Sequence, residues 1–322
     1  MIDPATIVYH ESSTDENDNY VHFRVGTEFG KFTKGNVILA LKDLSGRIVW
    51  TWHIWITDKP EEILYEGGIS FIDRNIGALS AQTASSPIDN FGFVYQWGRK
   101  DPFFGGDGIN NGTPLDFASY TIHNAGTSWQ HVQTSQIAGY EKQNPMTFIS
   151  NNPRTANLST MLVVDWLSVS DPNRWSDSNK TDHDPCPSGY KVPGMNKLQA
   201  LHNAYDAWVK GGQISQDRYF KNEDNWRWIY KFTPVSGGIS QSIWPAAGMR
   251  QGRNGNNSAQ LIHSGTATVK GQCYYWSSSP FKVGTTTVHG VSLRVHTSGN
   301  ILYSVDDYSD NADAYPIRCV KE

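Results

Sequence analysis

The C-terminal end of the chain, from Trp244 to Val320, constrains the fold most strongly. Its short runs 243–248, 274–279, 291–296 and 315–320 are rich in aromatic and β-branched residues, and clusters of Gly, Asn, Ser and Asp separate them. Runs of this length and composition, divided by turn-forming residues, are typical of β-strands joined by loops. We therefore expect a β-rich fold with long ordered loops, in which the preceding residues act as scaffold for this end.

The run 291–296 has the period of a half-buried strand. Alternation divides it into two faces, Val291, Leu293 and Val295 against Ser292, Arg294 and His296. We expect the apolar face to pack and the polar face to be free to contact a ligand.

Two polar segments, 250–270 and 298–314, have neither a helical nor a strand period. Long irregular loops inside a compact domain are uncommon and are usually functional or disordered. Tyr303 and Tyr308 favour a functional loop over a merely solvated one, which is the alternative. The acidic residues of the second segment offer carboxylates for calcium, although a solvated acidic loop is the simpler interpretation; they are Asp306, Asp307, Asp310 and Asp313.

The composition agrees with a loop-rich β protein. Only 38% of the 322 residues are hydrophobic, whereas the chain has 12 Trp, 15 Tyr, 29 Gly and 15 Pro. The formal net charge of −4 gives no electrostatic footprint for nucleic acid, and no basic run suggests binding to an anionic membrane surface.

No apolar run approaches the roughly 18 residues of a membrane span, and the first residues lack the pattern of an export signal. The opening Met1–Pro4 leads at once into strand-like residues, which would suit a chain from which a signal and an earlier domain have been removed.

Of the three cysteines, Cys186 lies in the motif Asp-Pro-Cys-Pro-Ser-Gly, Cys319 lies in the last strand, and no CxxC pair indicates a zinc site. We predict a disulfide between Cys186 and Cys319, which closes a loop of about 130 residues and gives roughly 4–5 kcal/mol in the chain-entropy model. Such a bond implies an oxidising compartment. Two buried free thiols are the alternative.

The N-terminal region reads as strands, with a hairpin formed by 36–42 and 47–56 around the turn 43–46. The clearest helix is 195–209, which has an apolar stripe and ends at a Gly pair. A shorter helix is expected at 160–167. We divide the chain into a small β region, residues 1–62, and a larger domain, residues 63–322.

Recognised catalytic motifs are lacking. The sequence has no GxSxG, no HExxH, no P-loop and no GxGxxG, and no pair of carboxylates stands out for glycoside hydrolysis. Asp182 and Asp184, with the histidine between them, are a weak candidate for metal binding. We therefore expect a non-enzymatic protein, with a carbohydrate-active hydrolase as the alternative.

Several of these motifs occur in the order found in a known family. Asp184–Pro193, the helix after it, Trp244–Arg250, Tyr275–Ser279 and Ile317–Val320 together resemble the Fibrobacter succinogenes major paralogous domain. The resemblance covers about residues 63–322 and implies an α+β, β-rich, C-type-lectin-like fold. Residues 42–55 also resemble the segment that precedes this domain in fimbrillin-like surface proteins of gut Bacteroidales.

The resemblance implies an extracellular adhesin at the cell surface or pilus tip. Some relatives are targets of diversity-generating retroelements, which rewrite a C-terminal variable region. The display positions implied here are Arg294, His296, Tyr303, Asp306, Asp307, Tyr308, Asp310, Asn311 and Asp313. The calcium-lectin triplets Glu-Pro-Asn, Gln-Pro-Asp and Trp-Asn-Asp are absent, so calcium-mediated sugar binding is not expected. Sulfatase-modifying enzymes share the fold but need a cysteine pair at their active site. Because Cys186 and Cys319 are assigned to the scaffold, we do not expect catalysis of that type either.

The expected partners follow from these residues. Tyr, Arg, His and Asp at the display positions favour a host or bacterial surface protein slightly over a glycan as the ligand. A structural pilus subunit that contacts other subunits through its N-terminal strands is a further alternative.

Overall fold

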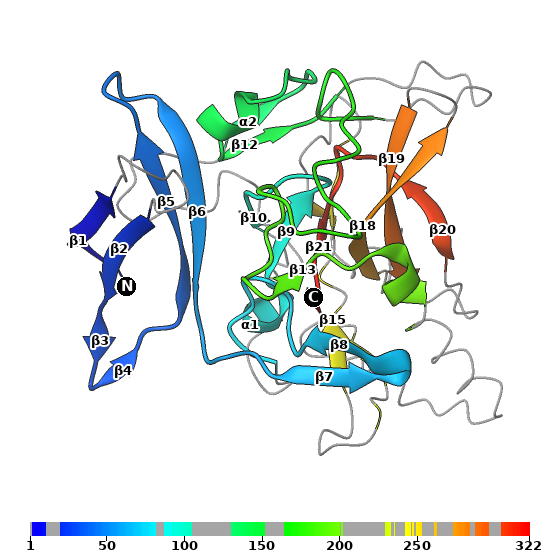
Figure 1. Ribbon diagram of the computed structural model, residues 1–322, viewed down its shortest axis with the longest axis horizontal. Coiled ribbons are helices and arrows are strands. Elements are labelled where there is room, and N and C mark those ends of the chain that lie inside the picture. Colours follow the sequence, from blue (N-terminus) through cyan, green and yellow to red (C-terminus); the bar gives the residue numbers. More distant parts are fainter. Residues whose placement is uncertain are drawn as a thin grey trace.

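The computed structural model describes residues 2–10, 20–81, 87–104, 130–151, 164–199, 201, 229–232, 235, 242–245, 247, 249–252, 261–262, 273–283, 287–295 and 304–322. Strands dominate this part of the chain, as the sequence predicts, and the helices α1 (Pro87–Phe91) and α2 (Tyr140–Gln143) are short. Figure 1 shows the N-terminal strands as a group to one side, with the other elements gathered around the C-terminus.

Two antiparallel sheets form the centre of the molecule. The first has the order β10-β9-β21-β16-β17 and the second the order β13-β22-β8-β7. Their strands are β7 (Glu62–Tyr65), β8 (Ile69–Ile72), β9 (Phe93–Gln96), β10 (Phe103–Phe104), β13 (Tyr190–Lys191), β16 (Met249–Arg250), β17 (Leu261–Ile262), β21 (Ala314–Pro316) and β22 (Val320–Lys321). Because Val320 of β22 pairs with Phe71 of β8, the two ends of residues 63–322 lie side by side.

A third antiparallel sheet has the order β18-β19-β20. It consists of β18 (Cys273–Val283), β19 (Thr287–Val295) and β20 (Ser304–Ser309), and β20 is its edge strand in the described part of the chain. The expected strand at 291–296 is therefore confirmed over 291–295, which are part of β19, and His296 lies outside the described residues. Figure 1 shows this sheet on the side of the core away from the N-terminal strands.

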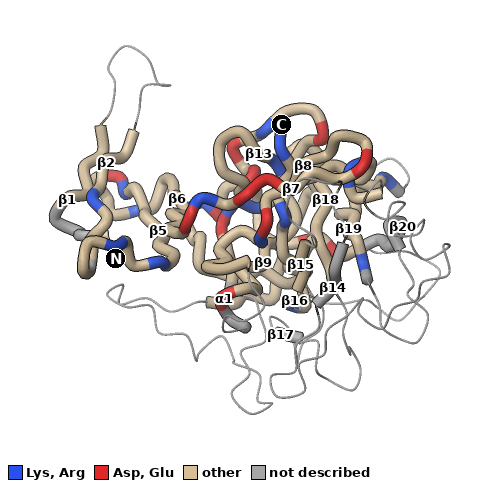
Figure 2. Tube along the Cα trace, turned by 90° about the horizontal axis from the view of Figure 1, so that it is seen from below, with Lys and Arg blue, Asp and Glu red and all other residues tan. Residues whose placement is uncertain are grey.

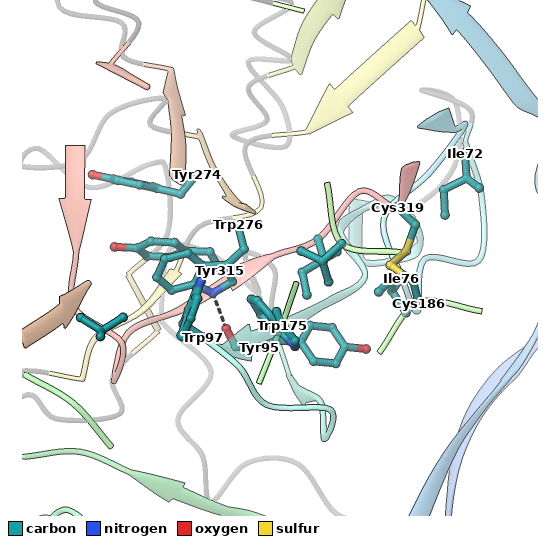
Figure 3. Close-up of a cluster of buried hydrophobic side chains, with 13 residues drawn as sticks. Ile72, Ile76, Tyr95, Trp97, Trp175, Cys186, Tyr274, Trp276, Tyr315 and Cys319 are labelled. Carbon is teal, nitrogen blue, oxygen red and sulfur yellow. Dashed lines mark hydrogen bonds between the residues drawn. A yellow bond between two sulfur atoms is a disulfide. The ribbon is translucent and has the colours of Figure 1, made fainter. Parts of the chain in front are cut away.

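Aromatic side chains from distant segments join this sheet to the core. The Trp276 ring lies 4.2 Å from the Tyr315 ring, centroid to centroid, and its Nε1 donates to the carbonyl of Tyr95 at 2.6 Å (Figure 3). Trp97 Nε1 in turn donates to the carbonyl of Ser277 at 2.9 Å. All four aromatic side chains are at most 3% exposed. Since both indole N–H groups are satisfied, this core can bury large aromatic side chains without leaving a donor unpaired.

The predicted disulfide is present. Cys186 and Cys319 are bonded, with their Cα atoms 5.9 Å apart, and both side chains are buried beside Ile72 and Ile76 (Figure 3). The bond joins the segment that precedes β13 to the segment that precedes β22.

A buried carboxylate shapes the loop around Cys186. Asp184 Oδ1 accepts the backbone N–H of Cys186 at 2.8 Å, and Oδ2 accepts that of Val192 at 2.9 Å. Lys180 Nζ donates to Asp184 Oδ1 at 3.0 Å and to the carbonyl of Tyr190 at 2.9 Å. The motif at 184–193 is therefore a folded unit that fixes the position of one cysteine.

The described residues of the N-terminal region contain three hairpins. Each has two antiparallel strands: β1 (Ile2–His10) with β2 (Tyr20–Val25), β3 (Thr27–Glu28) with β4 (Lys31–Phe32), and β5 (Gly35–Lys42) with β6 (Ile48–Ile56). The hairpin expected at 36–56 is confirmed.

One face of β6 packs against the larger domain. Thr51 Oγ1 donates to the carboxylate of Asp101 at 2.5 Å, and Trp55 Nε1 donates to the carbonyl of Ala78 at 3.0 Å. Trp55 also packs against the aromatic core. These two residues share a face of the strand because side chains alternate along it.

Two helix predictions have different outcomes. Residues 195–199 are helical, so the expected helix begins where the sequence predicts, although most of its remainder lies outside the described residues. The helix expected at 160–167 is wrong for its described part, because 164–167 is irregular and Leu167 forms a parallel bridge with Gln136. The other described elements are η2 (Glu66–Gly68), the parallel pair β11 (Gln130–Val132) and β12 (Thr147–Ile149), and the antiparallel pair β14 (Ile229–Phe232) and β15 (Ser242–Pro245).

Candidate ligand-binding face

The central strand of the C-terminal sheet is buried on both sides. Val291 and Leu293 are 5% and 1% exposed, as their apolar face predicts, but Ser292 is fully buried as well. Its hydroxyl forms a hydrogen bond of 2.8 Å with that of Ser309. The expectation of an open polar face is therefore wrong at Ser292, because a small hydroxyl can be buried once another hydroxyl satisfies it.

Among the candidate site residues whose side chains the structure describes, Arg294 is partly exposed. It pairs with Tyr274 across the strands, and its guanidinium carbon lies 5.2 Å from the centroid of that ring. The Tyr274 ring stacks on Tyr315 at 4.8 Å. A guanidinium over an aromatic face is held by the ring quadrupole, so Arg294 has a defined position at the margin of the core.

Edge strand β20 carries three of the candidate residues. Asp307 lies opposite Ser292, Tyr308 lies opposite Val291, and Asp306 precedes them in the strand. The pairing places their backbone in one sheet with Arg294, whereas their side chains lie outside what the structure describes. His296 and Tyr303 also lie outside the described residues.

The last three candidates are buried, so their assignment to a display surface is wrong. Asp310 and Asn311 are 2% exposed and Asp313 is 5% exposed. Asp313 Oδ1 accepts the backbone N–H of Gly252 at 2.6 Å, and its Oδ2 accepts the Tyr315 hydroxyl at 3.0 Å. The carboxylate thus ties the loop before β21 to the segment after β16.

The side-chain amide of Asn311 joins three different groups. Its Oδ1 accepts the N–H of Gly290 at 2.5 Å, and its Nδ2 donates to the carbonyl of Val288 at 2.8 Å and to Asp165 Oδ2 at 2.7 Å. This one amide holds β19 against the segment at 164–167. Sequence reasoning missed the role because short polar side chains in a Gly- and Asp-rich stretch are also typical of solvated loops.

The described residues do not form the metal sites considered from sequence. Among them, no group of three or more His, Cys, Asp and Glu side chains could hold a metal ion. Asp310 Oδ1 accepts the backbone N–H of Val164 at 3.3 Å, and the carboxylate of Asp184 is occupied by the donors given above. His183 Nδ1 faces Arg174 Nη2 at 3.2 Å, so a guanidinium stands where a metal would bind that nitrogen.

Two buried carboxylates have the perturbed acidity that a hydrolase would use, yet both have structural partners. Burial raises the pKa of Asp165 and of Asp184 above the ordinary value. Asp165 accepts the Ser170 hydroxyl at 2.6 Å and the Leu167 N–H at 2.9 Å. These contacts order loops within the core.

Arg294 and the backbone of β20 thus lie in one sheet. No helix in the described residues is long and apolar enough to cross a membrane. A scan against protein-family models, a search of curated proteins and a search of solved structures each found no match.

Proposed function

We propose that this protein is a non-enzymatic binding module of the C-type-lectin-like class, located on the cell surface or at a pilus tip. Its ligand-binding residues are Arg294 of the central strand β19 and Asp306, Asp307 and Tyr308 of the edge strand β20. The ligand is a surface protein of a host or another bacterium, or a glycan, and protein is favoured because Arg and Tyr are common anchors of protein interfaces.

One observation carries the proposal. An edge strand bearing Asp306, Asp307 and Tyr308 is fixed to a core of buried aromatic rings and a disulfide. A backbone paired in a sheet in this way needs less ordering when it binds, so more of the contact energy becomes affinity. The same arrangement would tolerate replacement of edge residues, which is what a target of a diversity-generating retroelement requires.

Two further features support the class and the location. The motifs of the major paralogous domain occur in order along 63–322, and the pairing of β8 with β22 closes this region at its two ends. A disulfide between buried cysteines is typical of proteins from oxidising compartments outside the cytosol.

A binding screen tests the proposal. Purified protein is applied to arrays of glycans and of surface proteins, and hits are repeated with the Arg294→Ala/Tyr308→Ala variant. We expect a saturable ligand that the variant binds at least tenfold more weakly, with an unchanged unfolding midpoint. Equal binding by the variant would refute the assignment of the face.

The hydrolase alternative has its own assay. Glycan hits are incubated with the protein at several pH values, and the products are separated by chromatography. Cleavage that a carboxylate-to-amide substitution abolishes would replace the binding module with an enzyme. Intact glycans support the proposal.

A further inference from the structure

The hairpin of β3 and β4 presents two phenylalanines to solvent. Phe29 lies in the two-residue turn between the strands and is 97% exposed, and Phe32 in β4 is 66% exposed. The phenylalanines of the core, such as Phe71, Phe103 and Phe148, are fully buried by comparison. Figure 1 shows this hairpin at the outer end of the N-terminal strands, away from α2 and from β20.

The backbone of the turn gives no structural reason for a phenylalanine. The φ angle of Phe29 is 51° and that of Gly30 is 75°, so both central residues have the positive φ of a type I′ turn. Such turns favour Asn-Gly, Asp-Gly or Gly-Gly, because a bulky side chain is strained in this region. Packing does not offset the strain, since the ring is almost wholly exposed. A strained and exposed aromatic residue indicates a contact outside the chain.

The size of this apolar tip limits what it can bind by itself. The two rings together expose roughly 300 Å², on the scale of the area that an aromatic side chain buries. A stable protein interface buries about 800 Å² on each partner, so the tip falls well short of one. A lipid bilayer accepts a small convex apolar tip without a matching pocket, and the affinity rises with the apolar area that enters it.

The charges at the tip and where the hairpin joins the rest of the chain come in opposite pairs. They are the cross-strand neighbours Glu28 and Lys31, and the ion pairs of Lys34 with Asp58 and of Arg74 with Asp73. Figure 2 shows acidic and basic residues interspersed along the described chain, and the formal net charge of the sequence is −4. Long-range attraction to an anionic surface is therefore not expected, and a zwitterionic bilayer fits the tip better.

We propose that the hairpin of β3 and β4 is a membrane contact, in which Phe29 and Phe32 enter the interfacial region of a zwitterionic phospholipid bilayer. The exposed Lys31 extends its ammonium to the lipid phosphates, while its aliphatic stem lies beside the apolar surface. Two rings give weak, reversible binding. The bilayer is that of a neighbouring cell, an assignment that rests on the proposed location at the cell surface, whereas the contact itself does not.

Vesicle flotation of the full chain tests the contact. Protein is mixed with phosphatidylcholine vesicles and centrifuged through a density gradient, and the floating fraction is measured against the lipid concentration. We expect the wild type to float in a fraction that rises with lipid and saturates. Phe29→Asn/Phe32→Thr should lower the partition coefficient by about tenfold or more for each ring removed.

The two replacements are chosen to preserve the hairpin. Asparagine is preferred at the position of Phe29 in this turn, and threonine suits a strand, so the unfolding midpoint of the variant should equal or exceed that of the wild type. Leu44→Ser is the matched control, because Leu44 is a fully exposed apolar residue in the turn of the β5–β6 hairpin. This control should float like the wild type.

Four results would overturn the proposal. They are a wild type that does not float at any lipid concentration, undiminished flotation of Phe29→Asn/Phe32→Thr, an equal loss in Leu44→Ser, and flotation that requires phosphatidylserine in the vesicles. The first would leave the tip to a protein partner, and the last would show electrostatic attraction in place of insertion of the rings.

Discussion

Removal of the disulfide has a stability cost that follows from the length of the loop it closes. Cys186 and Cys319 are separated by 133 residues. In the chain-entropy model, a cross-link across a loop of this length lowers the entropy of the unfolded chain enough to stabilise the native state by about 5 kcal/mol. Both side chains are at most 5% exposed, so truncation also removes packing in the core.

The Cys186→Ala/Cys319→Ala variant is compared with the wild type by guanidinium unfolding without reductant. We expect the free energy of unfolding to fall by about 4–5 kcal/mol, a large part of the stability of a typical domain. Alanine leaves no buried polar group, so the effect reflects the lost cross-link and packing.

Wild-type protein unfolded in reductant is the internal control and should approach the variant. A loss below about 1 kcal/mol, in wild-type protein whose bond is verified by mass spectrometry, would contradict the reasoning. It would mean that the unfolded chain remains compact enough to make the cross-link redundant.

Three other predictions follow from the contacts of the core. Asn311→Ala removes the hydrogen bonds that this amide makes with Gly290 N–H, Val288 C=O and Asp165 Oδ2, so it should lower the free energy of unfolding by about 3 kcal/mol or more, measured by chemical denaturation. The fragment 35–322 should express as folded protein. The fragment 63–322 should aggregate, because it lacks β6, which contacts Asp101, Ala78 and the aromatic core. Gel filtration of the two fragments tests this difference. Burial lowers the pKa of His53 from 6.5 to about 4 in the folded protein. As the pH falls, the unfolded chain therefore binds a proton at His53 before the folded protein does. The contribution of His53 to stability is lost as the pH falls from about 6.5 toward 4. His53→Gln should flatten this part of the curve of unfolding free energy against pH. A curve identical to that of the wild type would contradict the burial argument. The raised pKa values of Asp165 and Asp184 change stability in the opposite direction, but they are common to both proteins.

Some strands of this protein could be predicted from local sequence because their signals are local, whereas the expectation of an irregular loop at 298–314 is wrong at 304–309, which form β20. The hairpin of β5 and β6, the strand β19 and the start of the helix at 195 follow from alternation, turn residues and apolar spacing. The cysteine pair was predictable from position and motif.

Burial of polar residues could not be predicted in the same way. Ser292, Asn311 and Asp313 read as exposed, since a sequence shows their polarity but not the partner that satisfies them. Important partners lie far along the chain, as the bonds of Asn311 to Asp165 and of Asp313 to Gly252 show.

The central claim is that the ligand binds at Arg294 of β19 and at Asp307 and Tyr308 of the edge strand β20. The most direct measurement is the Kd of the ligand found in the screen for Arg294→Ala/Asp307→Asn/Tyr308→Ala.

A matched control takes the same residue types from exposed positions elsewhere, Arg24→Ala/Asp182→Asn/Tyr20→Ala. We predict a loss of binding of about a hundredfold or more in the first variant, as expected when several anchor residues are removed, and wild-type affinity in the control. Wild-type affinity in the first variant, with its fold intact, would contradict the account.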